Sequence, residues 1–356
     1  MRGAFSLVLL LGTVNAGCNG YRPPPAAPLR GETVSGQGPT QVWATRAGRR
    51  LTGPVVLTDG HLYGAGVDRK VYAVDMETGQ VSWTSRLSGL VAGGVLVSGD
   101  TVFAASSRPE GRVYALERAT GKRIWRAKTG PVGAPLALVG RTLLVPSQRG
   151  QLLGLDPANG SRRWRIRMGM ARVAPVSVGG GAVVVATVDS IYRITAEAGT
   201  VTHRVRTPGT IVSPWVGHRG LLIAGTTDSQ VVALSPADLS IRWSAAVDAP
   251  VLGSPAALGD TLYVASRRGT LFRIPPGDSP VPQRIVELEW PVTAPVSVVD
   301  GNLLLGGADG ALRALRPDGS EAWRIQLWRP VELSPVALDD GLLAIGGNGD
   351  LHRYRE

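Results

Sequence analysis

The chain has 356 residues, of which 44% are hydrophobic and 18% charged, with 47 glycines and 26 prolines. This apolar content is too high for an intrinsically disordered chain, and a single cysteine excludes a fold held together by internal disulfides. The 38 basic and 27 acidic residues give a formal net charge of +11, which favours anionic surfaces or acidic partners; an arginine-rich composition on solvated faces would give the same count.

The first residues predict an export signal. Arg2 supplies a positive start, residues 5–12 form a short apolar stretch, and small residues precede Cys18. No later stretch is apolar for long enough to cross a membrane as a helix. We therefore expect residues 1–17 to be a signal peptide, and we expect an exported chain of this kind to have no nucleic-acid partner.

The segment Asn15-Ala16-Gly17-Cys18 resembles a bacterial lipobox, although Asn15 stands where leucine is usual. The resemblance implies that a lipoprotein signal peptidase cuts before Cys18 and that this residue is acylated, which anchors the protein to a membrane. The alternative is an ordinary signal peptide that is cut nearby and leaves a free thiol. An unpaired exposed thiol is a liability in an oxidising compartment, which favours the lipidated form.

Residues 18–39 are polar and rich in proline and glycine, including three consecutive prolines at positions 23–25. Such a composition is typical of a semi-extended tether. We therefore expect the folded domain to comprise residues 40–356.

Internal repetition is the strongest pattern in the sequence. Tryptophans recur at intervals of about 40 residues, a spacing typical of propeller blades or helical repeats; they are Trp43, Trp83, Trp125, Trp164, Trp243 and Trp323. The spacing predicts two further members, and His203 and the segment Gln283-Arg284 stand in those places.

The content of each repeat indicates strands. Short apolar runs such as Val71-Tyr72-Ala73-Val74 are followed by an aspartate, a Thr-Gly turn and then the tryptophan, with glycine, asparagine or aspartate every eight to twelve residues. Amphipathic helices would need longer uninterrupted runs and fewer glycines. We expect the tryptophan to begin an outer strand and to pack between neighbouring sheets.

Eight repeats can be counted from the residues that begin their first strands: Pro54, Gly94, Pro135, Pro175, Pro214, Pro255, Pro295 and Pro335. The last repeat lacks its fourth strand, whereas Gln41-Val42-Trp43 is a fourth strand without a repeat. The sequence therefore predicts an all-β fold, an eight-bladed β-propeller of four-stranded antiparallel blades. Its ring is closed by the N-terminal strand joining the C-terminal blade, which leaves few free edges. We expect the ring to be monomeric.

The pattern from Ala73 to Trp83 resembles the repeat of the pyrroloquinoline-quinone-like propellers, and the resemblance covers roughly residues 40–356. With the lipobox and eight blades, the chain is most similar to those lipoproteins of the family that assist outer-membrane protein assembly. The resemblance implies a non-enzymatic scaffold, anchored by lipid at the periplasmic face of the outer membrane or at another envelope surface. Its implied partners are the periplasmic domains of a β-barrel insertase and unfolded outer-membrane proteins.

The resemblance also implies a partner-binding segment, because in these lipoproteins the loop entering the fourth blade contacts the insertase. The corresponding residues here are Met168, Met170 and Arg172, where exposed methionines beside an arginine suit an adaptable interface. The methionines could equally pack under the rim. The family's acidic pair before the next blade is missing, since Thr210 and Ile211 stand there.

Quinoprotein dehydrogenases share this propeller and hold calcium and a quinone with carboxylate and amide ligands. The turn aspartates Asp75, Asp156 and Asp318 are explained by turn capping, and the four histidines show no metal-ligand spacing. We expect no catalytic residues, no metal and no cofactor. Two alternatives stay open: a module that binds a small ligand or a cell-wall polymer, and a divergent quinoprotein oxidoreductase.

Overall fold

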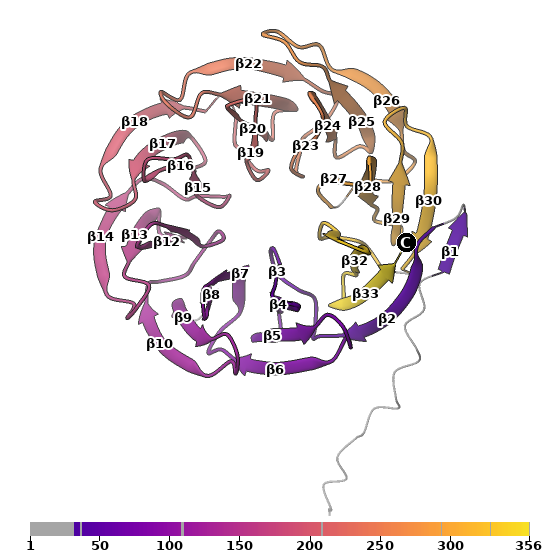
Figure 1. Ribbon diagram of the computed structural model, residues 1–356. Coiled ribbons are helices and arrows are strands. Elements are labelled where there is room, and N and C mark those ends of the chain that lie inside the picture. The colour runs from indigo at the N-terminus through magenta and orange to yellow at the C-terminus, as the bar shows by residue number, and fades with distance from the viewer. Residues whose placement is uncertain are drawn as a thin grey trace, which may run out of the picture.

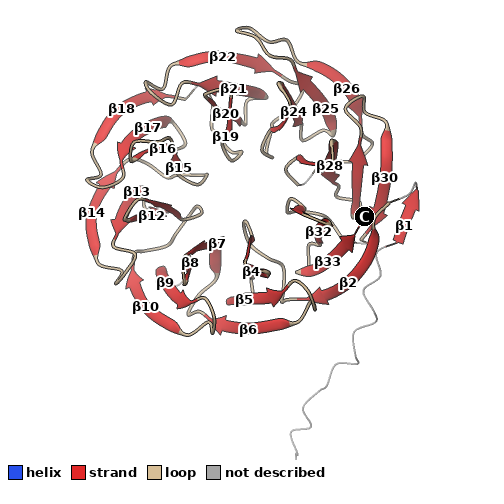
Figure 2. Ribbon diagram, viewed as in Figure 1, coloured by secondary structure: helices blue, strands red, loops and turns tan. Residues whose placement is uncertain are grey.

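The computed structural model describes residues 32–35, 38–107, 110–207, 209–292, 294–327 and 329–355. The regular elements in these ranges are all strands (Figure 2). They form eight antiparallel sheets that stand as blades around a common axis, as Figure 1 shows. The predicted eight-bladed propeller is confirmed. The signal peptide and Cys18 lie outside the described residues, and nothing within them forms a helix suited to crossing a membrane.

The first four blades follow one another along the chain, each with its first strand innermost. Blade 1 comprises β3 (Val56–Thr58), β4 (His61–Ala65), β5 (Lys70–Asp75) and β6 (Val81–Arg86). Blade 2 comprises β7 (Val91–Ser98), β8 (Thr101–Ser106), β9 (Arg112–Glu117) and β10 (Arg123–Lys128). Blade 3 comprises β11 (Ala137–Val139), β12 (Thr142–Ser147), β13 (Gln151–Leu155) and β14 (Arg162–Arg167). Blade 4 comprises β15 (Val176–Ser177), β16 (Ala182–Ala186), β17 (Ser190–Thr195) and β18 (Val201–Arg206).

The other four blades continue the ring, and the last two also use strands from the N-terminal region. Blade 5 comprises β19 (Val216–His218), β20 (Leu221–Gly225), β21 (Gln230–Leu234) and β22 (Ile241–Ala246). Blade 6 comprises β23 (Ala256–Leu258), β24 (Thr261–Ala265), β25 (Thr270–Ile274) and β26 (Gln283–Glu287). Blade 7 comprises β27 (Ser297–Val299), β28 (Asn302–Gly306), β29 (Ala311–Leu315), β30 (Glu321–Gln326) and β1 (Glu32–Ser35). Blade 8 comprises β31 (Val336–Leu338), β32 (Gly341–Ile345), β33 (Asp350–Arg355) and β2 (Thr40–Arg46).

The core lies between blades. The second and third strands of each blade are buried along most of their length, as in β12 and β16, because both faces of the sheet are covered by neighbouring blades. The outer strands alternate between exposed and half-buried residues, as in β14. Apolar clusters such as that of Leu143, Val145 and Phe103 join residues of adjacent sheets, so that each blade depends on its neighbours for burial.

The ring closes as the sequence predicts. β2 pairs antiparallel with β33, with Thr40 opposite Arg355 and Arg46 opposite Asp350. The Arg46 guanidinium donates to both carboxylate oxygens of Asp350, at 2.6 and 3.3 Å. This pairing joins the two ends of the folded domain and removes the free edge of β33.

One strand corrects the predicted tether. Residues 18–39 were expected to carry no folded element, but Glu32–Ser35 forms β1, which pairs antiparallel with the outer strand β30 of blade 7. Figure 1 shows β1 outside the ring, next to β30. Blade 7 therefore has five strands, and its outer edge is covered by the segment that precedes the closing strand.

The repeated tryptophans connect neighbouring blades, which confirms their predicted packing position. In four blades the indole Nε1 donates to a carbonyl in the turn between the third and fourth strands of the next blade. The pairs are Trp43 with Met76 (3.0 Å), Trp83 with Arg118 (2.9 Å), Trp125 with Pro157 (2.9 Å) and Trp164 with Ala196 (3.0 Å).

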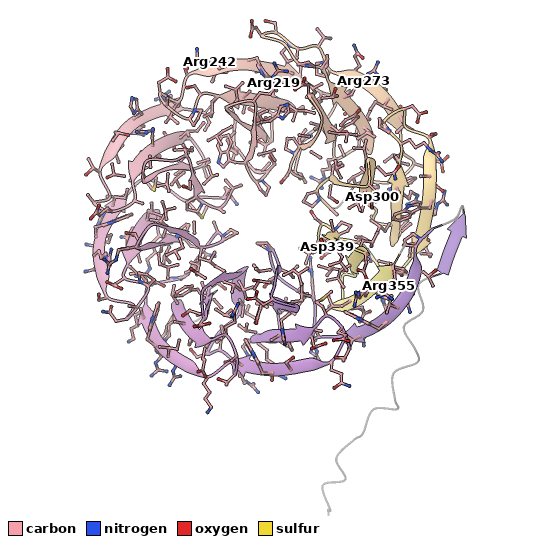
Figure 3. All side chains as sticks on the ribbon, in the orientation of Figure 1. Arg219, Arg242, Arg273, Asp300, Asp339 and Arg355 are labelled. Atoms are coloured by element: carbon pink, nitrogen blue, oxygen red, sulfur yellow. The ribbon has the colours of Figure 1, made fainter. Side chains whose placement is uncertain are left out.

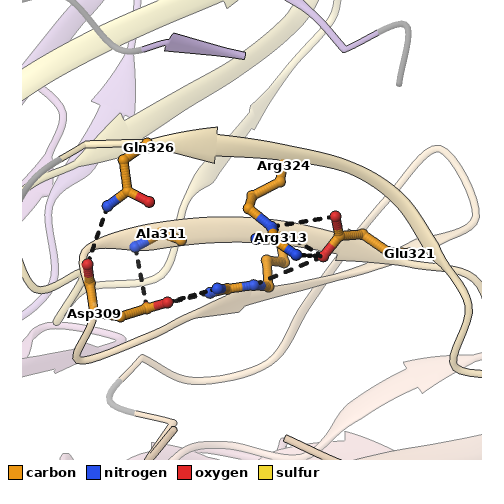
Figure 4. A network of polar contacts seen from close by, with 6 residues as sticks. All are labelled: Asp309, Ala311, Arg313, Glu321, Arg324 and Gln326. Carbon is orange, nitrogen blue, oxygen red and sulfur yellow. Dashed lines mark hydrogen bonds and ion pairs between the residues drawn. The ribbon is translucent and has the colours of Figure 1, made fainter. Parts of the chain in front are cut away.

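Blade 7 carries a network of charged side chains, which Figure 4 shows. The buried Arg313 guanidinium contacts Asp309 at 2.5 Å and Glu321 at 3.7 Å, and it lies 3.5 Å from the ring centroid of Trp290. Arg324 completes the network with a 2.8 Å bond to Glu321. These carboxylates are therefore paired within the blade, and Glu321 and Arg324 belong to β30, the strand with which β1 pairs.

Candidate functional site

The antiparallel blades give the ring two faces. One face, which we call the linker face, consists of the segments that connect one blade to the next and the turns between second and third strands. The other, the turn face, consists of the first-to-second and third-to-fourth turns. Connecting segments on a rigid ring can differ in side chains without disturbing the strands, so the linker face is the first place to look for a binding site.

The predicted segment Met168–Arg172 lies on the linker face between blades 3 and 4, and its residues differ in exposure. Met168 is buried, with 6% of its surface exposed, and packs with Val183 and Val185. Met170 is half-buried and Arg172 is exposed. Of the two alternatives that the sequence left open, exposure is therefore wrong for Met168, and packing under the rim is right: its side chain lies between blades 3 and 4.

The backbone holds this segment in place. The N–H groups of Met168 and Gly169 both donate to the carbonyl of Gly150, at 3.0 and 3.2 Å. Ala171 forms an isolated β-bridge with Thr187, in the turn between β16 and β17. Met170 and Arg172 therefore project from a segment that is fixed on both sides.

Val188 was not predicted from the sequence and belongs to the same region. It follows Thr187, is 41% exposed, and its carbonyl accepts a 3.2 Å bond from the Thr210 hydroxyl. Thr210 therefore ties the next connecting segment to this turn, whereas Ile211 is buried. The spacing of the repeats does not predict that the valine in this turn, next to Asp189, is exposed. We call Met170, Arg172 and Val188 the blade 4 patch.

A basic surface covers the outer strands β10, β14 and β18. Equivalent positions of these strands carry six cations that have no carboxylate within 4.0 Å in the part of the chain that the structure describes: Arg126, Lys128, Arg165, Arg167, Arg204 and Arg206. A groove of about 490 Å³ between blades 2 and 3 is lined by four cations, Lys128, Arg149, Arg162 and Arg165, and by one carboxylate, that of Glu110. By contrast Arg46, Arg50 and Arg163 are paired with carboxylates. The net positive charge is therefore concentrated on blades 2 to 4, beside the blade 4 patch.

The turn aspartates cap turns, as the sequence predicts. Asp75 Oδ1 accepts the N–H groups of Glu77 and Thr78 at 3.0 and 2.8 Å, and Asp318 Oδ1 accepts that of Ser320 at 2.9 Å. These bonds to backbone and hydroxyl groups lower the pKa of both carboxyls. Asp156 is held by Arg163, which lowers its pKa, together with the N–H of Ala158.

The histidine and acidic side chains of the described residues do not gather into a metal site. Within the described ranges, no three histidine, cysteine, aspartate or glutamate side chains lie close enough together to hold a metal ion. The histidines are far apart: His61 and His218 bond backbone carbonyls in turns, His203 lies on an outer strand, and His352 is buried against Tyr354. A metal-held cofactor would need a convergent set of oxygen donors.

A family model described as "Outer membrane protein assembly factor BamB" matches residues 31–110, 109–214 and 209–279, which together span well over half of the chain. The chain belongs to this family. Among solved structures, BamB from Moraxella catarrhalis superposes with a TM-score of 0.76 and 17% identity, over 89% of this chain and 97% of that one. The propeller resemblance inferred from the repeat is thereby confirmed.

Enzymes are also among the similar proteins. The quinohemoprotein alcohol dehydrogenase from Comamonas testosteroni has a TM-score of 0.72 and 13% identity, over 88% of this chain and 76% of that one. A quinoprotein ethanol dehydrogenase from Pseudomonas putida is 30% identical over 103 residues, which are 26% of this chain and 16% of that protein. The chain thus matches only a small part of that enzyme, and the structural likeness to the first is one of fold.

Proposed function

We propose that the protein is a scaffold lipoprotein for the assembly of outer-membrane β-barrel proteins and that it binds the periplasmic domains of a barrel insertase through the blade 4 patch. Membership of the BamB family carries the proposal. The patch combines a half-buried methionine, an exposed valine and an exposed arginine on one fixed segment and its neighbouring turn. Such a mixture of adaptable apolar contact and a guanidinium suits a protein interface.

The proposal includes acylation at Cys18 and a position at the periplasmic face of the outer membrane. The lipobox-like segment before Cys18 supports it, and Asn19 supports outer-membrane sorting, because aspartate there would favour retention in the inner membrane. The basic surface of blades 2 to 4 would attract an acidic partner domain toward the neighbouring patch. Electrostatic attraction of this kind mainly increases the rate of association.

Purification of the full-length lipoprotein from its own membranes in mild detergent, followed by mass spectrometry, tests the proposal. We expect an outer-membrane barrel insertase to co-purify and to be lost when Met170→Ala and Arg172→Glu are combined. Met168 is left unchanged, because replacing its buried side chain would destabilise the fold, and a loss of folding would look like a loss of binding. Purification with cell-wall or transport proteins instead would overturn the proposal.

Leu252→Ala is the matched control. Leu252 occupies the position equivalent to Arg172 in the segment between blades 5 and 6 and is 46% exposed. We expect this variant to retain the insertase, because it alters the same kind of segment at another place on the ring. Equal loss in both variants would argue against a specific role of the blade 4 patch.

A second candidate is a divergent quinoprotein oxidoreductase, which the 30% identity over 103 residues to the ethanol dehydrogenase favours. Among the described residues, no three histidine, cysteine, aspartate or glutamate side chains converge on a position where a metal could hold the quinone. Titration of the purified protein with pyrroloquinoline quinone and calcium, followed by calorimetry, separates the two candidates. Saturable, calcium-dependent uptake would support the enzyme, and we expect none.

A further inference from the structure

Trp243 differs from four of the other repeat tryptophans. The indole N–H groups of Trp43, Trp83, Trp125 and Trp164 each donate to a carbonyl of the next blade. Trp243, in β22, makes no such bond to any residue that the structure describes; it is half-buried and lines a pocket between blades 5 and 6. A polar N–H with no protein partner beside a cavity is a group that a ligand can satisfy.

The cause lies in the turn that faces Trp243. In blade 3 the third and fourth strands are joined by residues 156–161, but in blade 6 they are joined by residues 275–282, which include four prolines. This longer connection replaces the Asp…Gly turn against which the other tryptophans pack. It leaves a pocket of about 300 Å³, open on the turn face.

The pocket has an apolar interior and a charged rim. Trp243 and four aliphatic side chains form the interior: Leu221, Ile223, Leu262 and Ile274. Two arginines, two aspartates and a histidine form the polar rim: Arg219, Arg242, Asp260, Asp278 and His218. Arg219 pairs with Asp260 at 3.2 Å. Figure 3 shows Arg219 and Arg242 near each other on blade 5. The rim charges cancel, so the pocket has no preference for a net charge.

This lining selects among ligand classes. A saccharide would place hydroxyl groups against aliphatic side chains that cannot bond them, which costs free energy. An ionic ligand would meet charges of both signs on the rim, so the rim favours neither anions nor cations. An aromatic ring fits the interior and can pack against the Trp243 indole, and a peptide backbone both donates and accepts hydrogen bonds at a neutral rim.

We propose that this pocket binds an aromatic side chain of an extended, uncharged polypeptide segment, with the Trp243 N–H donating to a backbone carbonyl of that segment. The pocket opens on the turn face, whereas the blade 4 patch lies on the linker face. The site is therefore separate from the proposed insertase contact and does not depend on it. The pocket at Trp243 would be a second binding site on the ring, for polypeptide segments with exposed aromatic side chains such as those of an unfolded protein.

The test uses the full chain and an acetylated, amidated pentapeptide of alternating threonine and phenylalanine, with alanine replacing phenylalanine in the comparison peptide. Calorimetry should detect binding of the phenylalanine peptide and no binding of the alanine peptide. Trp243→Phe keeps a ring but removes the N–H, and we expect it to weaken binding about fivefold. Leu221→Trp fills the pocket from a half-buried position and should abolish binding, with the melting temperature recorded to verify folding.

Trp125→Phe is the matched control, because it removes the same N–H from a tryptophan that donates to the carbonyl of Pro157 in the next blade. It should leave peptide binding unchanged. Binding that is equal for both peptides, or equal in Leu221→Trp and the unmodified protein, would overturn the proposal. So would saturable binding of an N-acetylglucosamine oligomer that Leu221→Trp removes, since the pocket would then be a saccharide site.

Discussion

The indole ring of Trp164 in blade 3 occupies the space that a side chain at Gly199 in blade 4 would need. A Cβ atom on Gly199 would lie 2.6 Å from the indole Cδ2 atom, and Gly199 has a φ of +69°. The same relationship joins Gly79 to Trp43 and Gly160 to Trp125. The glycine and the tryptophan of the repeat are therefore one unit that spans two blades.

Replacing Gly199 by alanine should destabilise the ring by about 2–4 kcal/mol, because the left-handed backbone is strained and the methyl group meets the indole. Gly179→Ala, in the same blade, is the control: its φ is +84°, but no atom lies within 4 Å of the added methyl group. It should cost only about 1 kcal/mol. Urea midpoints measure both, and equal shifts would contradict the role of the tryptophan contact.

The repeat let the ring, its closure and the tryptophan contacts be predicted, because each depends on residues that recur at a fixed spacing. The strand β1 was missed because its partner β30 lies near the other end of the sequence and because the composition around β1 is that of a linker. The sequence left open whether Met168 is exposed or buried, because strand alternation does not set the direction of a side chain just beyond the end of β14. The pocket at Trp243 depends on how a proline-rich connection folds, which periodicity does not report.

A coupled substitution replaces the glycine–tryptophan unit between blades 4 and 5. His203 stands in the tryptophan position, and Leu239 stands in the glycine position of the next blade, with a φ of +62° and only 1% of its surface exposed. Arg193 donates to the carbonyl of Pro236 at 3.1 Å, in place of an indole N–H. The leucine side chain fills space between these blades that a tryptophan fills elsewhere.

Leu239→Gly alone should destabilise the protein by about 1–3 kcal/mol, since it leaves a cavity. His203→Trp alone should also destabilise it, because the new ring meets Leu239. The double variant should lose at least about 1 kcal/mol less free energy of unfolding than the two single variants lose together. Chemical denaturation of the four proteins measures this coupling free energy, and additive effects would show that the two positions are independent.

The contact between Arg46 and Asp350 should contribute measurably to ring closure. The Asp350 side chain is 7% exposed and its partner 48% exposed, so removal of the arginine leaves a largely buried carboxylate without its cation. Arg46→Ala should therefore cost about 1–3 kcal/mol. Arg50→Ala, which breaks the solvent-exposed pair with Glu332, should cost less than about 1 kcal/mol. A larger effect of Arg50→Ala on the urea midpoint would refute this ranking.

His352 should make stability decrease in weak acid. It is 2% exposed, its ring is stacked on Tyr354, and burial lowers its pKa below the ordinary 6.5, although Asp350 opposes the shift. Below about pH 6.5 the unfolded chain takes up a proton that the folded chain binds less readily, so the free energy of unfolding falls as pH decreases. The slope for one proton is at most about 1.4 kcal/mol per pH unit.

His352→Gln should flatten the dependence of the urea midpoint on pH between 7 and 5. The turn aspartates Asp75, Asp156 and Asp318, whose pKa values are lowered, contribute stability that is lost at more acidic pH and do not obscure this window. His203→Gln, on an exposed outer strand, is the control and should keep the slope of the unmodified protein. An unchanged slope in His352→Gln would assign the acid sensitivity to groups other than the buried histidine beside the closing strand.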